Sequence, residues 1–198
     1  MRRHAIVLVI AFAALAAGLP ARGFAQQFGV GGSVGWTNDV GREDAQFDSF
    51  KFGHYSGWFE YKMEDSVLLR LSGGTFKTKQ TASGSIIETP TGSATVPELD
   101  ERVNYGMVGV SYRFWEGFFT SGLFGGIGGY GIHPGDVDPQ YASLTDRRET
   151  VFGWHAGTEG EFTVTRNLGI DLRLTYHNIS AHPHRQFVAA DMGATFRF

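Results

Sequence analysis

A histidine, a serine and an aspartate near the end of this 198-residue chain are the first residues that could do chemistry. His177 stands three residues before Ser180, and Asp191 follows later in the chain. These are the groups of a serine hydrolase. On a β-strand, however, a spacing of three places His177 and Ser180 on opposite faces. We therefore expect His177 to be an interior or rim histidine rather than a catalytic base.

Metal and phosphate chemistry have weaker support in the sequence. His182 and His184 could meet His133, but no cluster of acids completes a coordination set. The glycines of 125–129 lack the Gly-Lys-Ser/Thr of a phosphate-binding loop, and we interpret them as strand glycines. The chain has no cysteine, which excludes thiol nucleophiles and Cys-ligated metals. We expect neither a metal nor a cofactor.

The first 25 residues have the pattern of a cleavable secretory signal. Arg2 and Arg3 precede an apolar run over 5–19, and Gly23 and Ala25 form a small-residue site before Gln26. The apolar run is short for a membrane-spanning helix, which needs about 20 residues. Removing 1–25 takes away three arginines and no acid, so the net charge falls from -3 to -6. An acidic mature domain over 26–198 argues against a nucleic-acid partner.

Alternation of apolar and polar residues recurs through the rest of the chain. It is clearest over 168–177, where Leu, Ile, Leu, Leu and Tyr alternate with Gly, Asp, Arg, Thr and His. A period of two predicts strands with one apolar and one polar face. Eight strands are predicted, at 28–37, 54–61, 67–74, 107–114, 118–130, 152–162, 168–177 and 188–198. Glycine prevents assignment of the two faces over 118–130.

The connections between these strands alternate in length. Short turns are predicted at 63–66, 115–117 and 165–167, and long polar links at 38–49, 77–100, 131–147 and 178–186. A meander with this alternation has every long loop at one end. The pattern predicts an all-β, antiparallel up-and-down transmembrane barrel with short periplasmic turns and long extracellular loops. The Ser, Thr, Gly and Pro residues of 81–95 predict a flexible loop tip.

The polar face carries few charges, and they are of both signs. A soluble sandwich or lipocalin-like barrel would instead expose many Lys and Glu residues on that face. Sparse charges suit a narrow lumen in which each must find a partner. We expect Arg70 and Arg173 to pair with Glu60, Glu159, Asp171 or Asp191. The candidate lumen residues are Glu60, Arg70, Arg113, Glu159, Asp171, Arg173 and Asp191.

Aromatic residues gather at the predicted strand ends, as they do at the two interfaces of a membrane. Ordinary strand propensity explains their number but not this placement. The periplasmic group is Phe28, Tyr61, Phe114, Phe118, Phe162, Phe196 and Phe198, and the extracellular group is Trp36, Tyr55, Trp154 and Tyr176.

With its signal, its eight-strand meander and its final strand 188–198 ending in Phe198, the chain resembles the small outer-membrane β-barrels of the OmpA transmembrane-domain and OmpX type. The resemblance implies a bacterial outer-membrane location among lipid and lipopolysaccharide. It also implies that Phe196 and Phe198 form a signal for the barrel-assembly machinery. No peptidoglycan-binding module is expected after Phe198.

The function indicated by this resemblance is non-enzymatic. We expect a lumen filled by side chains and extracellular loops that serve structural, adhesive or other surface interactions with a partner that the sequence does not name. Two alternatives stay open. One is a narrow solute channel. The other is a lipid A-modifying hydrolase, because His177, Ser180 and Asp191 faintly resemble the His-x-Ser and later acid of lipid A deacylase barrels, although the spacing and the acid differ.

Overall fold

The computed structural model describes residues 27–40, 51–79, 86–89, 92–95, 100–115, 117–135, 148–181 and 184–198. The predicted signal segment 1–25 and its processing site before Gln26 lie outside these residues. In the part of the chain that is described, there is no helix with the length and apolar character needed to span a membrane.

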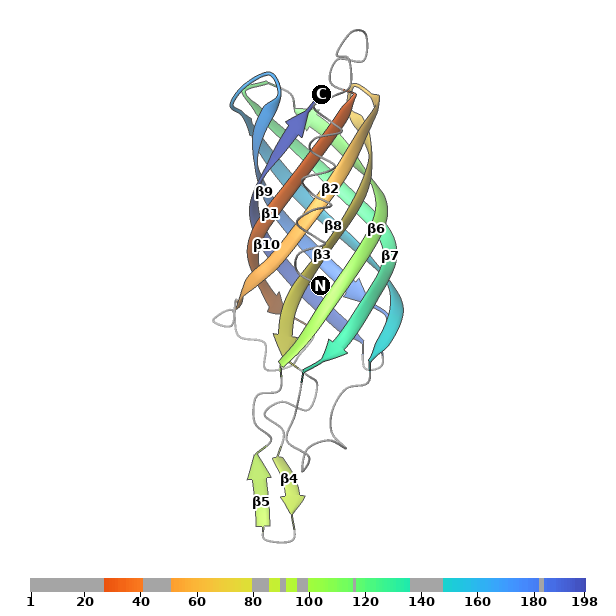
Figure 1. The fold of residues 1–198 in the computed structure, drawn as a ribbon, viewed down its shortest axis with the longest axis vertical. Coiled ribbons are helices and arrows are strands. Elements are labelled where there is room, and N and C mark those ends of the chain that lie inside the picture. The colour runs from red at the N-terminus through yellow and green to blue at the C-terminus, as the bar shows by residue number, and fades with distance from the viewer. Residues whose placement is uncertain are drawn as a thin grey trace, which may run out of the picture.

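Eight long antiparallel strands form a closed barrel (Figure 1). Each strand pairs with its neighbours along the chain, and the first strand pairs with the last to close the sheet. The predicted all-β, eight-stranded up-and-down barrel is therefore confirmed. The barrel strands are β1 (Phe28–Asp39), β2 (Lys51–Glu64), β3 (Val67–Lys79), β6 (Asp100–Trp115), β7 (Phe119–Pro134), β8 (Glu149–Thr163), β9 (Leu168–Ile179) and β10 (Arg185–Arg197).

Short and long connections lie at opposite ends of the barrel. The short ones, between β2 and β3, β6 and β7, and β8 and β9, lie at the end that also holds the C-terminus (Figure 1). We call this the turn end. The links after β1, β3, β7 and β9 leave the opposite end, which we call the loop end. This arrangement agrees with the predicted alternation of connection lengths.

The link between β3 and β6 contains regular structure that the sequence analysis did not predict. Residues of the expected flexible tip form a two-stranded hairpin, β4 (Ile86–Thr89) with β5 (Gly92–Thr95), beyond the loop end (Figure 1). Two adjacent β-branched residues, Ile86 and Ile87, favour the extended backbone of β4. Composition alone predicted a flexible loop tip, because Ser, Thr and Gly dominate the segment, and gave no sign of this strand pairing.

Where the two faces of a barrel strand differ in polarity, the polar face points inward. In β9, for example, Asp171, Arg173 and Thr175 are buried while Leu172 and Leu174 are exposed. The pattern also settles the face of β7, which glycine had obscured. Phe124 and Tyr130 point inward, and Leu123 and Ile127 point outward. Buried charged residues inside the barrel and exposed large apolar residues outside it are the reverse of the arrangement in a soluble globular domain.

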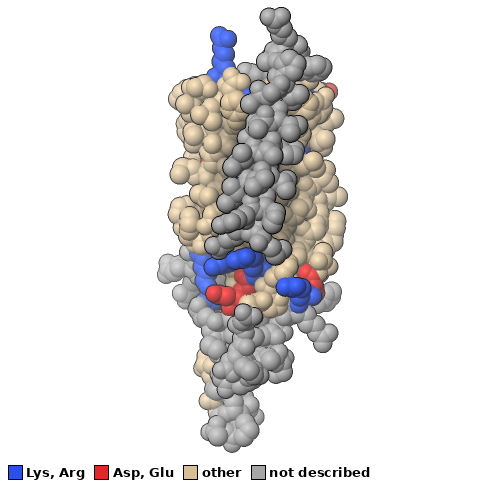
Figure 2. Space-filling view, in the orientation of Figure 1, with Lys and Arg blue, Asp and Glu red and all other residues tan. Residues whose placement is uncertain are grey.

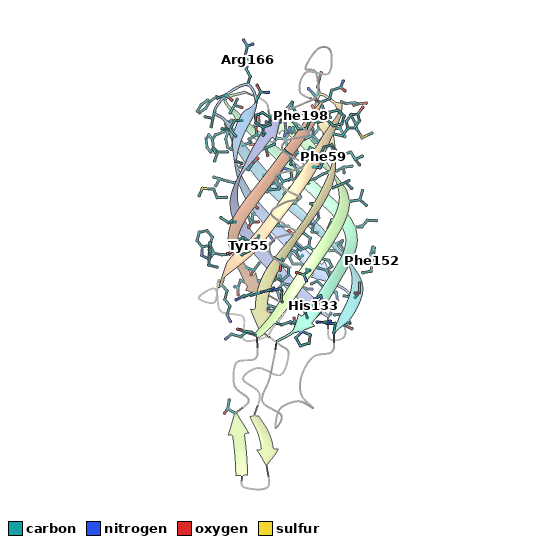
Figure 3. The ribbon with its side chains drawn as sticks, viewed as in Figure 1. Tyr55, Phe59, His133, Phe152, Arg166 and Phe198 are labelled. Carbon is teal, nitrogen blue, oxygen red and sulfur yellow. The ribbon has the colours of Figure 1, made fainter. Side chains whose placement is uncertain are left out.

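Aromatic side chains on the outer wall cluster near both ends (Figure 3). At the turn end, the Phe28 ring lies 5.7 Å from that of Phe59 and 6.2 Å from that of Phe198. Toward the loop end, the rings of Trp36 and Phe52 are 5.4 Å apart. Aromatic groups near the two ends match the belts that the sequence predicted.

Inward glycines leave room for long side chains to cross between strands. Gly35 of β1 pairs in register with His54 of β2 on one side and Asp191 of β10 on the other. A Cβ atom at Gly35 would lie 2.1 Å from the Ala190 carbonyl oxygen and 2.2 Å from Asp191 Oδ1. The absence of a side chain at this position therefore allows His54 and Asp191 to meet across β1.

This close approach generates a stability prediction. Gly35→Ala should lower the free energy of unfolding by about 1–3 kcal/mol, because the backbone and Asp191 would have to shift to admit the methyl group. Gly32→Ala is the matched control on the same strand, since its Cβ would make only an ordinary 3.4 Å contact. Urea titration in lipid vesicles, followed by tryptophan fluorescence, measures both. Equal stability of the two variants would contradict the packing described for Gly35.

Candidate functional site

The structure brings all seven candidate lumen residues onto the inner face of the barrel. The Arg113 side chain keeps 14% of its surface exposed. The other six residues are buried: Glu60, Arg70, Glu159, Asp171, Arg173 and Asp191. Inside the barrel they do not form a single group. Glu60, Arg70, Arg113, Glu159 and Arg173 belong to one connected set of contacts, whereas Asp171 and Asp191 each have another partner.

Four residues in the middle of the barrel form what we call the ion-pair cluster: Glu60, Arg70, Glu159 and Arg173. Arg70 donates to Glu60 through Nη2 and, at 3.1 Å, through Nε. Its Nη2 also donates to Glu159 at 2.9 Å. Arg173 Nη2 lies 3.2 Å from Glu159 Oε2 and 3.8 Å from Glu60 Oε1. Two guanidinium groups thus share two carboxylates, which offsets part of the cost of burying four charges.

Neighbouring polar and aromatic groups complete this cluster. The Ser111 hydroxyl donates to Glu159 Oε1 at 2.7 Å. The Arg173 guanidinium lies 3.3 Å from the centre of the Trp58 ring, and the Arg70 guanidinium lies 5.3 Å from that of Phe124. Cations above aromatic faces are stabilised by the ring quadrupole, more strongly where water is excluded. The aromatic rings therefore help to stabilise two buried guanidinium groups of like charge.

A second charged group lies nearer the turn end. Arg197 forms a two-pronged ion pair with Glu161, through Nη1 to Oε1 at 2.5 Å and through Nη2 to Oε2. Arg113 Nη2 lies 3.5 Å from Glu161 Oε2 and from Glu60 Oε2. This arginine therefore connects the second group to the ion-pair cluster.

Asp171 and Asp191 do not have the arginine partners that the sequence analysis named among its options. Asp171 accepts a hydrogen bond from the Thr195 hydroxyl at 2.8 Å. Asp191 Oδ1 lies 2.5 Å from His54 Nδ1. Arg173 is paired in register with Asp191, but its guanidinium turns instead to the Trp58 ring and Glu159. Side-chain direction, which strand register does not fix, decides the partner.

On the loop-end side of the ion-pair cluster lies a histidine–tyrosine layer, made of His54, Tyr105, Tyr130, His155 and His177. His54 Nε2 and the Tyr105 hydroxyl are 3.0 Å apart, and the Tyr130 hydroxyl and His177 Nδ1 are 2.9 Å apart. The rings of His155 and His177 are 5.7 Å apart. The layer joins polar groups from five strands, β2, β6, β7, β8 and β9, by hydrogen bonds and ring contacts.

The groups considered for hydrolase chemistry separate in the structure. His177 is fully buried and bonded to Tyr130, Asp191 is bonded to His54, and Ser180 is exposed at the loop end. His182 of the metal alternative lies outside the described residues, and no group of three possible metal ligands occurs among those described. His177, Ser180 and Asp191 are thus not arranged as the catalytic triad that the hydrolase alternative requires.

Nearest the loop end, an apolar plug fills the lumen. Its side chains are fully or almost fully buried and come from β3, β6, β7, β9 and β10: Phe76, Val103, Ile132, Ile179 and Phe187. Arg185, two residues before Phe187 in the chain, forms a buried ion pair with Glu101 and also donates to the Lys79 carbonyl at 3.0 Å. The plug and this ion pair obstruct the lumen independently of the ion-pair cluster.

Sequence reasoning did not single out several residues that matter here: His54, Glu101, Tyr105, Tyr130, Arg185 and Arg197. Strand parity was the available signal for His54 and Arg197, because both stand on the polar face of a predicted strand. Tyr105 and Glu101 lie before the segment predicted as the fourth strand, and Tyr130 lies in the strand whose faces were unassigned. For Glu101, Tyr105 and Tyr130, no feature of the sequence pointed specifically to a place in the lumen.

The shared carboxylates make Arg70 the most sensitive residue of the ion-pair cluster. Arg70→Met should lower the free energy of unfolding by about 3–5 kcal/mol, because two buried carboxylates lose one of the two guanidinium groups that they share. Lys62→Met is the control, because Lys62 pairs at 3.0 Å with an Asp65 side chain that is 94% exposed. Exposed pairs contribute about 0–1 kcal/mol. Chemical unfolding of both variants in vesicles tests this, and a similar cost for each would contradict the assignment.

Comparison with solved structures finds the same fold in small barrels from other bacteria. Neisserial surface protein A matches with a TM-score of 0.62 and 12% identity, covering 88% of this chain and 99% of that one. The N-terminal β-barrel domain of Pseudomonas aeruginosa OprF matches with a TM-score of 0.52 and 14% identity, covering 87% and 99%.

Ail, the attachment invasion locus protein of Yersinia pestis, was solved with the heparin analogue sucrose octasulfate. It matches with a TM-score of 0.51 and 14% identity, covering 87% of this chain and 99% of that one. At these identities the similarity concerns the fold.

A search of curated protein sequences gave no match. The family described as the outer membrane protein beta-barrel domain matches residues 5–197, nearly the whole chain. The inward polar face, the outward apolar face and the closed eight-stranded sheet are the features that this family match explains. The chain therefore belongs to the outer membrane protein beta-barrel domain family.

Proposed function

We propose that this protein is a closed, non-conducting barrel of the bacterial outer membrane whose extracellular loops take part in structural, adhesive or other surface interactions. In this proposal residues 1–25 are a signal peptide, residues 26–198 form the barrel, and the loop end is extracellular. The observation that carries the proposal is the obstructed lumen. The ion-pair cluster and the apolar plug fill it at two levels. A barrel without a passage leaves its outer surface and loops for function.

The outer wall supports insertion in lipid. Leu71, Val110, Leu123 and Leu172 each expose about half of their surface on the outside of the barrel. In the view of Figure 2, the visible wall between the two ends carries few charges, and Lys, Arg, Asp and Glu gather near the loop end. An uncharged apolar band bounded by polar ends suits a bilayer.

A basic row at the loop end supports lipopolysaccharide as a membrane partner. Lys77 pairs in register with Arg102, and Arg102 pairs in register with His133. All three follow the outward parity of their strands, and Lys77 and Arg102 are exposed. Asp100, which is also exposed, pairs with Lys79 at the same edge. A row richer in cations than in anions complements phosphate groups at the membrane surface.

Conductance tests the closed lumen. Reconstituted in a planar bilayer, the protein should give no single-channel steps, because an eight-stranded barrel is just wide enough for the side chains that fill it. A larger porin inserted by the same procedure is the positive control for incorporation. Regular conductance steps from this protein would support the solute-channel alternative and refute the closed barrel.

Retention of lipopolysaccharide tests the basic row. The double variant Lys77→Gln, Arg102→Gln should retain about tenfold less purified lipopolysaccharide after detergent washing, because two charge-assisted contacts to phosphate are lost. Arg166→Gln is the control, since Arg166 is exposed at the turn end (Figure 3). Dephosphorylated lipopolysaccharide should bind the unaltered protein and the double variant equally weakly. Unchanged retention by the double variant would remove this partner from the proposal.

We also propose that Phe196 and Phe198 form the signal read by the barrel-assembly machinery. Support comes from their place on the closing strand, where their rings are 6.3 Å apart and Phe198 exchanges backbone hydrogen bonds with Phe28. Deleting Phe198 should leave secretion intact and lower the yield of barrel with heat-modifiable gel mobility. Full yield after the deletion would argue against the signal.

A further inference from the structure

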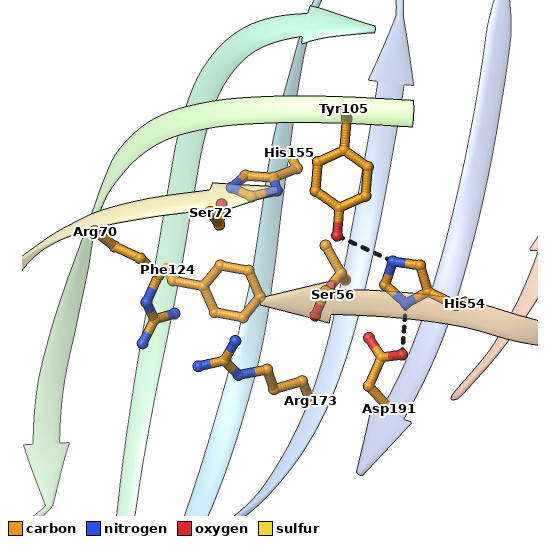
Figure 4. Close-up of a pocket in the computed structure, with 10 residues that line it drawn as sticks. His54, Ser56, Arg70, Ser72, Tyr105, Phe124, His155, Arg173 and Asp191 are labelled. Carbon is orange, nitrogen blue, oxygen red and sulfur yellow. Dashed lines mark hydrogen bonds and ion pairs between the residues drawn. The ribbon is translucent and has the colours of Figure 1, made fainter. Parts of the chain in front are cut away.

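A small cavity separates the ion-pair cluster from the histidine–tyrosine layer (Figure 4). Its volume is about 20 Å³. Arg70 and Arg173 line one side, and His155, Tyr105 and the His54–Asp191 pair line the other. About 10–15 Å³ is enough to hold one water molecule. The cavity thus has room for one small molecule or ion between two polar groups.

Several buried polar atoms of the lining lack a hydrogen-bond partner among the described residues. They are Arg70 Nη1, Arg173 Nε and His155 Nδ1. Arg173 Nη2 lies 3.2 Å from Glu159 Oε2 but is not aligned to donate to it. The three side chains are at least nine-tenths buried, with 3%, 8% and 6% of their residue surface exposed. Buried donors without acceptors are costly, so an occupant that accepts hydrogen bonds would stabilise this region.

The chemistry of these atoms restricts the occupant. Guanidinium N–H groups only donate, whereas a histidine nitrogen donates or accepts according to its tautomer. The two arginines already share the carboxylates of Glu60 and Glu159, and the carboxylate of Asp191, which is paired with His54, also lines the cavity. A further anion would add negative charge where carboxylates already outnumber guanidinium groups. A neutral group that can both accept and donate fits the site better than an anion does.

We propose that this cavity is a binding site for a single water molecule that accepts hydrogen bonds from Arg70 and Arg173 and bonds to His155. The water joins the ion-pair cluster to the histidine–tyrosine layer. Polar contacts then run from Arg197 near the turn end, through the ion-pair cluster and the water, to His155 of the histidine–tyrosine layer. The lumen consequently has a hydrated polar part and a dry apolar part. This inference is independent of the proposed surface function.

Filling the cavity distinguishes an occupied site from an empty one. Ser72 lines the cavity, and Ser72→Val would extend two methyl groups into it. If water is bound, the valine displaces it, leaves the arginine donors unpaired and lowers the urea midpoint relative to Ser72→Ala. If the cavity is dry, added apolar volume raises the midpoint. A midpoint equal to or above that of Ser72→Ala overturns the proposal.

Crystallography of the unaltered protein provides a second test, which stands even if Ser72→Val fails to fold. Density for one water within hydrogen-bond distance of Arg70 Nη1 and His155 Nδ1 is expected. Crystals soaked in sodium bromide should show no anomalous peak in the cavity. A bromide peak would show that the cavity binds an anion instead of water, and either that result or an empty cavity would refute the proposed water site. The conductance experiment is unaffected by any of these results.

Discussion

The pairing of β1 with β10 is the constraint on which the rest of the structure depends. Along this seam Gly29 to Asp39 face Arg197 to Phe187 in continuous antiparallel register. Without the seam, both strands would present a row of unpaired backbone groups, which cannot be tolerated in hydrocarbon. Closing eight strands also fixes a narrow interior. The inward residues must therefore fill that space and satisfy one another.

The interior meets this requirement in different ways along its length. Near the turn end and in the middle, arginines and carboxylates share partners, as in the contacts of Arg70 with Glu60 and Glu159. Toward the loop end, Phe76 and Phe187 pack with their ring centres 5.1 Å apart. Buried ions are not in themselves a strong source of stability. Their value here is that a polar inner face leaves the apolar face of each strand for lipid.

Much of this fold could be predicted from the sequence because strand parity is a local property. Leu172 and Arg173 differ in polarity, and that difference alone predicts opposite faces. The partner of Asp191 could not be predicted in this way. It depends on the register of three strands, on the missing side chain of Gly35 and on the direction taken by Arg173. The faces of β7 were likewise decided by its neighbours, and the pairing of β4 with β5 could not be predicted from composition.

Successive residues of one strand face the polar interior and the lipid in turn, and thiol accessibility can test this alternation in β9. The chain has no cysteine, so Asp171→Cys and Leu172→Cys each introduce a single thiol. In folded protein in vesicles, a membrane-soluble thiol reagent should label position 172 and leave position 171 protected. Both should react equally in urea. Labelling of 171 with protection of 172 would mean that the two faces are exchanged and that Asp171 faces lipid.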